Sequence, residues 1–228
     1  MHALDNVIWR ALTTRQSHFA ECFQSARRFV HEVTSLCAFE EPDAQGFADL
    51  GELVGIGSTA AVFLDDPYET QPGWEFIVGA PLLEMVCENG ADHKVHSDSM
   101  PEFVRLGAKD AAEMVELATL TKPGPFGMRT HELGAYVGIR LQGRLVAMAG
   151  ERLKVPGHTE VSAVCTHPDH IGKGYAGLLM QEIMRGIRER GETSFLHVRE
   201  DNTRAVALYE RLGFKTRIRL HFAVLRKT

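Results

Sequence analysis

The stretch from Val161 to Arg190, VSAVCTHPDHIGKGYAGLLMQEIMRGIRER, decides the fold. Its first residues are small, β-branched or apolar, which predicts a mostly buried strand; Pro168 offers no backbone donor, so the strand should end near Thr166. Apolar residues then recur at three- and four-residue intervals from Ala176 to Ile187, which predicts an amphipathic helix packed on a sheet. Gly191 is the expected helix stop.

Gly172 and Gly174 stand where this strand passes into the helix. Backbone N–H groups can converge there without obstruction by Cβ atoms, at the positive end of the helix dipole, and such a nest binds phosphate. A strand-to-helix turn also uses glycine merely to turn the chain, so the pair alone leaves both interpretations open. The turn is neither a Walker loop nor a three-glycine dinucleotide fingerprint.

Composition limits the class of protein. With 228 residues, 44% hydrophobic and 24% charged, the chain suits one large globular domain or two modest ones. A net charge of -5 argues against nucleic acid or an anionic membrane as partner. The first residues lack the pattern of a secretory leader and no stretch has the length of a membrane span, so we expect a cytoplasmic protein.

The four cysteines, Cys22, Cys37, Cys87 and Cys165, lie far apart and form no CxxC pair. They indicate neither a zinc site nor a disulfide framework. Asp92, His93, His96 and Asp98 could suggest a metal, but they fall in the polar stretch 88–101, which we interpret as a solvated turn or linker. No metal is expected.

The chain outside the decisive stretch alternates helix and strand patterns. We expect helices at 4–12, 43–54, 108–120 and 201–212 and strands at 59–64, 76–79, 103–106, 136–141, 145–150 and 194–199. We also expect a further apolar segment at 82–87, a strand beginning near Glu160 and a strand region at 214–225. Gln142-Gly143 predicts a hairpin, and the Pro- and Gly-rich residues 122–129 predict a loop over the site. From residue 101 the order is β-α-β-β-β-α-β-α-β, a mixed sheet with helices on both faces.

Two motifs together resemble a family. HPDHIGKGYAGLLM resembles the acyl-CoA pyrophosphate loop of the GCN5-related N-acetyltransferases (GNAT), whose pattern is Arg or Gln, two residues, Gly, one residue, then Gly or Ala. Gly174 and Ala176 match it, whereas Ile171 replaces the Arg or Gln, which implies a weaker or altered grip on the cofactor. DNTRAVALYERLGF, at 201–214, resembles the family's Asn-containing helix with its Tyr. The likeness covers 101–228 well and 1–100 poorly, and is greatest to the FR47-like branch.

The resemblance implies an α/β GNAT domain at 101–228 and an additional N-terminal α/β region at 1–100, which suggests a degenerate GNAT-like half. It implies transfer of acetyl from acetyl-CoA to a primary amine, of a small molecule or a peptide N-terminus, by direct attack in a ternary complex. A non-catalytic acyl-CoA-binding or regulatory module is the alternative. The sequence also leaves a homodimer open.

The resemblance also implies the site residues. Tyr209 would donate a hydrogen bond or proton to the CoA sulfur, and Glu160 would accept the amine proton directly or through water; Glu151 is a second candidate base. A thiol nucleophile formed by Cys165 beside His167 lacks a third, orienting group. The residues that would contact the cofactor are Val164, Cys165, Thr166, Ile171, Gly172, Lys173, Gly174, Tyr175, Ala176, Asn202, Ala205 and Tyr209.

Overall fold

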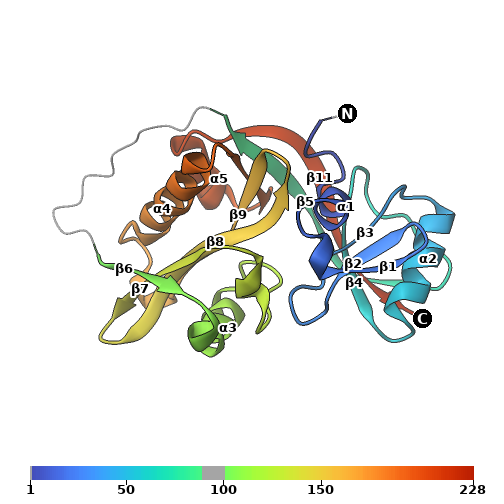
Figure 1. Ribbon diagram of the computed structural model, residues 1–228, viewed down its shortest axis with the longest axis horizontal. Helices are drawn as coiled ribbons and strands as arrows, with labels where there is room; N and C mark the ends of the chain where they lie inside the picture. Colours follow the sequence, from blue (N-terminus) through green and yellow to red (C-terminus); the bar gives the residue numbers. More distant parts are fainter. Residues whose placement is uncertain (1, 89–100) are drawn as a thin grey trace.

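A computed structural model describes residues 2–88 and 101–228 (Figure 1). The predicted linker at 88–101, with its candidate metal ligands, lies outside the described residues apart from its two ends. The helices are α1 (Val7–Thr13), α2 (Ala44–Val54), α3 (Ala111–Thr121), α4 (Tyr175–Glu189) and α5 (Thr203–Arg211). The strands are β1 (Ala20–Phe23), β2 (Ala26–Phe29), β3 (Cys37–Phe39), β4 (Thr59–Leu64), β5 (Trp74–Cys87), β6 (Phe103–Leu106), β7 (Tyr136–Leu141), β8 (Arg144–Val155), β9 (His158–Thr166), β10 (Thr193–Arg199) and β11 (Lys215–Lys227).

Most strands form one mixed sheet in the order β4-β11-β5-β10-β9-β8-β7-β6. Within it, β9 and β10 run parallel, and the other neighbours are antiparallel. The connection from β9 to β10 is α4, as a parallel pair requires. The predicted element order from residue 101 and the mixed α/β class are both confirmed.

Helices cover both faces of this sheet because side chains along a strand alternate between them. Val164 of β9 packs against a buried cluster to which α4 contributes Leu179 and Ile183. Cys165 of β9 packs instead in the cluster that contains Met114 of α3. The apolar stripe of α4 is therefore buried against one face, where each fully buried Leu or Ile contributes about 1.5–3 kcal/mol.

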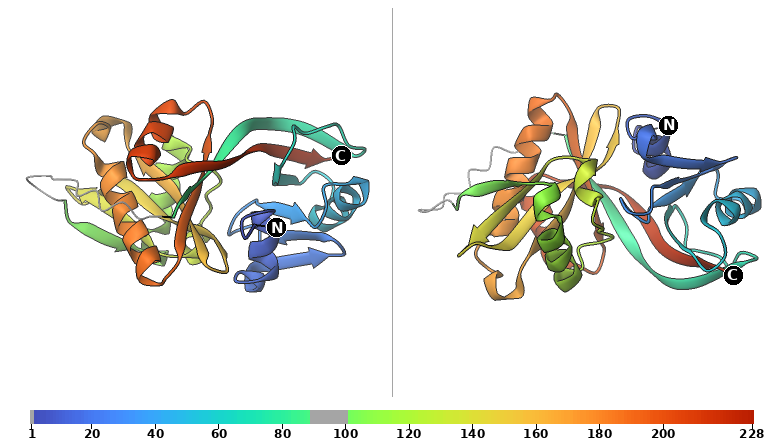
Figure 2. Two further views of the ribbon diagram at one scale, coloured as in Figure 1. Left: turned by 90° about the horizontal axis from the view of Figure 1, so that it is seen from above. Right: turned by 60° about the horizontal axis from the view of Figure 1, so that its bottom comes forward.

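Two long strands join the N-terminal region to the rest of the molecule. β5 and β11 run side by side across the whole length, from the part that holds α5 to the part that holds α2 (Figures 1 and 2). The strand predicted at 76–79 does not end at Gly79 but continues through the apolar segment at 82–87, because pairing with β11 continues through Gly79, Ala80 and Pro81.

The remaining N-terminal elements make a small second layer beside β4. There β1, β2 and β3 form an antiparallel sheet, and α2 packs against it through Phe47, Leu50 and Val54. Asp43 is the N-cap of α2, and its carboxylate accepts a hydrogen bond from the Gly46 N–H at 2.8 Å. Sequence periodicity could not assign β1–β3 because these strands have only three or four residues each.

The division of the chain into two domains at residue 100 remains a prediction. The sheet topology suggests that the residues before and after residue 100 unfold together. β5 precedes residue 100 and lies between β10 and β11, which follow it. We therefore expect residues 101–228 alone to lack cooperative unfolding, because β10 and β11 lose their shared neighbour. Thermal unfolding followed by circular dichroism, with the full chain as control, measures this. A sigmoidal transition in the fragment would contradict it.

Candidate active site

The hydrogen-bonded ladder between β9 and β10 ends inside the sheet. The strands pair only over residues 158–160 of β9 and 193–195 of β10, although β9 runs to Thr166 and β10 to Arg199. Both strands are fully described, and beyond residue 160 the backbone N–H and C=O groups of β9 that face β10 are not paired with it. An unpaired strand edge can bind an extended ligand that carries amide groups. The edge includes residues 164–166, which belong to the predicted cofactor contacts.

A β-bulge shapes β9 at the same place. Ala163 and Val164 stand together opposite the single residue Ala149 of β8. Ala163 has φ of +52°, a left-handed conformation that is unusual for a residue other than glycine. Bulges and such backbone strain concentrate at functional sites. The unpaired part of β9 is therefore also its most distorted part.

The glycine turn has the open geometry that a phosphate nest needs. Gly172 has φ of +89°, and Gly174, the N-cap of α4, has φ of +78°. A Cβ placed on either glycine would meet nothing within 4 Å, so the space before the turn is free. The first N–H groups of α4 have no partner within the helix and carry its positive dipole end. Binding of pyrophosphate by residues 171–176 stays a prediction, and Ile171 is exposed there.

The α5 helix presents the second motif. Asn202 caps it, because the side-chain oxygen accepts a hydrogen bond from the Ala205 N–H at 3.2 Å. Tyr209 is buried in the cluster that packs α4 on the sheet, with its ring at an edge to Phe214. Burial raises the pKa of Tyr209 to about 12, so its hydroxyl stays protonated. Its contact with the CoA sulfur stays a prediction.

Glu160 lies inside the sheet and is fully buried. Arg152 donates two hydrogen bonds to its carboxylate, at 2.8 and 2.6 Å, and Nδ1 of His197 lies 2.8 Å from the same group. Burial alone would raise the pKa of Glu160, but the charge and hydrogen bonds of Arg152, with those of His197, lower it to about 2. Such a carboxylate is a weak base. The catalytic role of Glu160 stays a prediction, and the geometry favours a role in positioning its partners.

A row of charged side chains continues from Glu160 across the sheet to its surface. Nε2 of His197 lies 3.4 Å from Glu84 of β5, which also binds Arg217 of β11. Arg217 in turn contacts Asp5, at 2.9 Å, beside a hollow between α1 and β4. Burial alone would lower the pKa of His197, but hydrogen bonds and charge from the two glutamates raise it.

The other candidates are less suited to catalysis. Glu151 is buried and bound by Lys154 at 2.8 Å and by Arg190 at 2.7 Å. Burial raises the pKa of Cys165 to about 11, so its thiol stays protonated and is a poor nucleophile. His167 is half-buried at the start of the turn that precedes the glycines.

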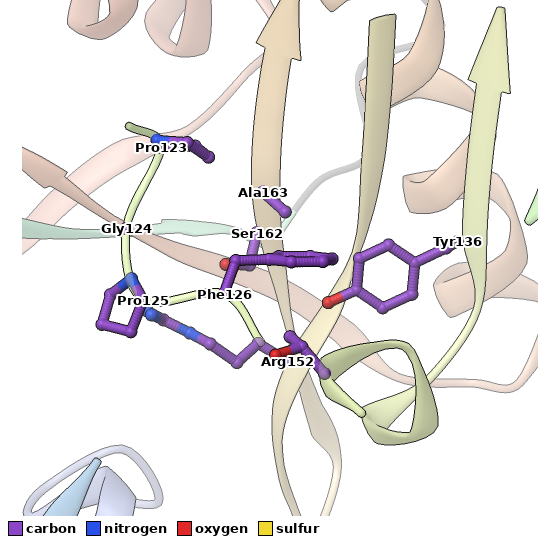
Figure 3. Close-up of a pocket in the computed structure, with 9 residues that line it drawn as sticks. Pro123, Gly124, Pro125, Phe126, Tyr136, Arg152, Ser162 and Ala163 are labelled. Carbon is purple, nitrogen blue, oxygen red and sulfur yellow. The ribbon is translucent and has the colours of Figure 1, made fainter. Parts of the chain in front are cut away.

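The Pro- and Gly-rich loop closes over the opposite face of the sheet from α4. Residues 123–126 and Thr130 pack over Tyr136, Arg152 and residues 162–163, and the crevice between them is narrow (Figure 3). The crevice therefore borders the bulge of β9. The loop predicted at 122–129 is found, and its place over the active site stays a prediction.

Sequence reasoning missed Arg152, Tyr136 and His197. β8 was expected to end at Gly150, but it runs to Val155 and thereby brings Arg152 beside Glu160. The alternation of apolar residues at 153 and 155 was a usable signal for this extension. No sequence pattern pointed to His197, because the two glutamates that it contacts lie on other strands, far away in the sequence.

The His197 pKa gives a pH-dependent prediction. A raised pKa in the folded state stabilises the protein fully below about pH 6.5, and this contribution is lost as pH rises through the folded-state pKa. We expect His197→Gln, which keeps a polar side chain but cannot gain the charge, to lower the free energy of unfolding by about 1–3 kcal/mol at pH 6 and by less at pH 9. Urea unfolding across this range measures the difference. A difference independent of pH would contradict it.

Comparisons with known proteins agree with this geometry. The model of the family described as FR47-like protein matches residues 136–223. The N-alpha-acetyltransferase RimI of Mycobacterium tuberculosis is 34% identical over 121 residues, which are 50% of this chain and 75% of that protein. Among residues 2–88 and 101–228, no helix combines the length and apolar character needed to cross a bilayer.

Solved structures match this chain over all or nearly all of its length. A GNAT-family protein of Novosphingobium aromaticivorans is 36% identical, with a TM-score of 0.88 and 100% of both chains covered. A GCN5-related N-acetyltransferase of Kribbella flavida has the same fold at 17% identity, with a TM-score of 0.62 over 96% of this chain and 92% of that one. The chain therefore belongs to the GCN5-related N-acetyltransferase superfamily, in its FR47-like branch, and is an acyl-CoA-dependent N-acetyltransferase.

Proposed function

We propose that the protein transfers acetyl from acetyl-CoA to a primary amine by direct attack in a ternary complex. The observation that carries this proposal is the unpaired edge of β9 directly before an open glycine turn. The unpaired backbone groups of this edge can hydrogen-bond the amides of the pantetheine arm of CoA. The backbone N–H groups of the turn can bind the CoA pyrophosphate. The thioester would then lie beside the bulge at Ala163, between α5 and the crevice under residues 123–126.

The reaction needs a neutral amine, a thioester carbonyl that is positioned next to it, and stabilisation of the departing thiolate. The amine lone pair forms the new C–N bond and the C–S bond breaks to leave the CoA thiolate. The surplus proton of the amine passes through water to that thiolate, which leaves as the CoA thiol. A phenol with a pKa of about 12 is a weaker acid than a thiol, whose ordinary pKa is about 8.5. Tyr209 therefore acts by donating a hydrogen bond to the thiolate, since complete proton transfer would be uphill.

The name of the relative supports an α-amine as acceptor. RimI of M. tuberculosis is an N-alpha-acetyltransferase, and this chain covers 75% of its length. No comparison favours the non-catalytic alternative. A screen of peptides with free N-termini, amino acids and small amines for CoA release from acetyl-CoA tests the proposal, and absence of release with every amine would contradict it.

The glycine turn gives a binding prediction with a matched control. We expect acetyl-CoA to raise the melting temperature, because ligand at about 1,000 times its Kd adds roughly 4 kcal/mol to the folded state. Gly174→Asp places a negative charge at the nest and should abolish this shift. Gly174→Asn has nearly the same size and left-handed strain without the charge, so it should retain most of the shift. Equal shifts in both variants would remove the turn from the pyrophosphate site.

Tyr209→Phe separates binding from turnover. The ring and its packing remain, so the melting temperature and the acetyl-CoA shift should change little. Loss of the hydrogen bond to the thiolate should lower kcat about tenfold. Steady-state CoA release with one accepted amine measures this, and wild-type kcat in the variant would exclude Tyr209 from the reaction.

A further inference from the structure

A hollow of about 590 Å³ lies between α1, the end of β4 and β11, beside the last member of the charged row. Its size is within the 300–1,000 Å³ that small-molecule sites usually have. Asp5, which ends the row, belongs to its lining, and the proposed acetyl transfer uses none of the lining residues. The hollow is therefore large enough to hold a ligand of its own.

The short strand β4 leaves this hollow open. β4 ends at Leu64, which pairs with His221, so residues 215–220 of β11 pair with β5 alone. No described strand pairs with the other side of this part of β11, where Ile218 and Leu220 contribute apolar surface to the hollow. Apolar surface of this kind is what small-molecule sites mostly present.

Phe63 of β4 separates the hollow from the candidate active site. Its side chain belongs to the lining, and its ring centroid lies 4.6 Å from that of His197. The His197 side chain, which contacts Glu160, is only 2% exposed, and neither of these two residues lines the hollow. A ligand in the hollow therefore contacts Phe63 and does not reach the carboxylate of Glu160.

The lining carries an excess of negative charge. Glu40, Glu41 and Asp65 are exposed, and none of their carboxylates forms an ion pair with a described residue. The fourth carboxylate, that of Asp5, is already paired with a guanidinium from β11. Among the described lining residues, Arg10 is the one cationic side chain. Three unpaired carboxylates against one guanidinium attract cations and repel anions.

We propose that this hollow binds a small organic cation, whose apolar body packs on Phe63, Ile218 and Leu220 and whose charged group lies among the three unpaired carboxylates. The ring of Trp9, which also lines the hollow, is a poorer place for the charge, because the Arg27 guanidinium already lies 4.8 Å from its centroid. The inference adds a second ligand site and does not rest on the proposed acetyl transfer.

The probe is benzyltrimethylammonium, a cation whose nitrogen has no N–H group and no free lone pair and which therefore cannot be acetylated. Phenylmethanesulfonate, which has the same benzyl group and a negative charge, is the comparison. We expect the cation, and not the sulfonate, to raise the melting temperature and to change tryptophan fluorescence in a saturable way. Added salt should weaken binding of the cation, because it screens the carboxylates.

Trp9 makes the fluorescence change specific to the hollow. The chain has two tryptophans, and the other, Trp74, is buried and donates a hydrogen bond to the Phe47 carbonyl at 3.1 Å. Trp9→Phe should therefore remove the fluorescence change and keep most of the increase in melting temperature.

Asp65→Asn and Asp66→Asn are matched variants. The two aspartates are adjacent and exposed, but only Asp65 lines the hollow. Each substitution removes one exposed charge, so both variants should fold. We expect Asp65→Asn to weaken binding of the cation about two- to fivefold, the worth of one exposed ion pair, and Asp66→Asn to weaken it less. Isothermal titration calorimetry measures both affinities.

Four results would overturn the inference. They are no saturable change with the cation, equal binding of the sulfonate, equal losses of affinity in the two aspartate variants, and competition of the cation with an accepted amine in steady-state kinetics, which would assign it to the acceptor site. Failure of the proposed function looks different, because a protein that releases no CoA with any amine would still bind the cation.

Discussion

The buried contact of Glu160 with Arg152 and His197 stands at the point where the sheet opens. Three adjacent strands, β8, β9 and β10, each supply one of these side chains, and the main-chain ladder between β9 and β10 ends at the same level. Side-chain hydrogen bonds thus connect the strands at the level where the backbone hydrogen bonds between β9 and β10 end. A buried ion pair contributes little net stability, but removal of one partner typically costs 3–5 kcal/mol. The network therefore fixes geometry more than it adds stability.

The N-terminal region contributes to the same network. Glu84 of β5 receives His197 on one side and Arg217 on the other, and Asp5 completes the row near α1. Because β5 lies between β10 and β11, the catalytic half is built on a strand from residues before 100. This arrangement suggests that the N-terminal region is a structural component of the sheet, whatever its ancestry.

Local patterns predicted most of the fold. The strand at 136–141, the hairpin after it and the glycine turn follow from short-range periodicity and from glycine positions, which tertiary contacts do not alter. Predictions failed where pairing with a strand distant in sequence determined the structure. Pairing with β11, for example, makes residues 74–87 one continuous strand. The site was less accessible to sequence reasoning. A glutamate at the start of a strand is typical of a surface charge or a base. Only the unpredicted extension of β8, which contains Arg152, places a cation beside Glu160.

The sheet order has a consequence for synthesis on the ribosome. β4 and β5 do not pair with each other; both pair with β11, which begins about 130 residues after β5 ends. At translation rates of about 5–20 residues per second, their edges wait roughly 6–26 s for this shared partner. Phe76, Ile77 and Val78 of β5 are exposed even in the folded protein, and an unpaired edge beside such apolar side chains can pair with other chains. Completion of the sheet is therefore a late event that depends on the last strand.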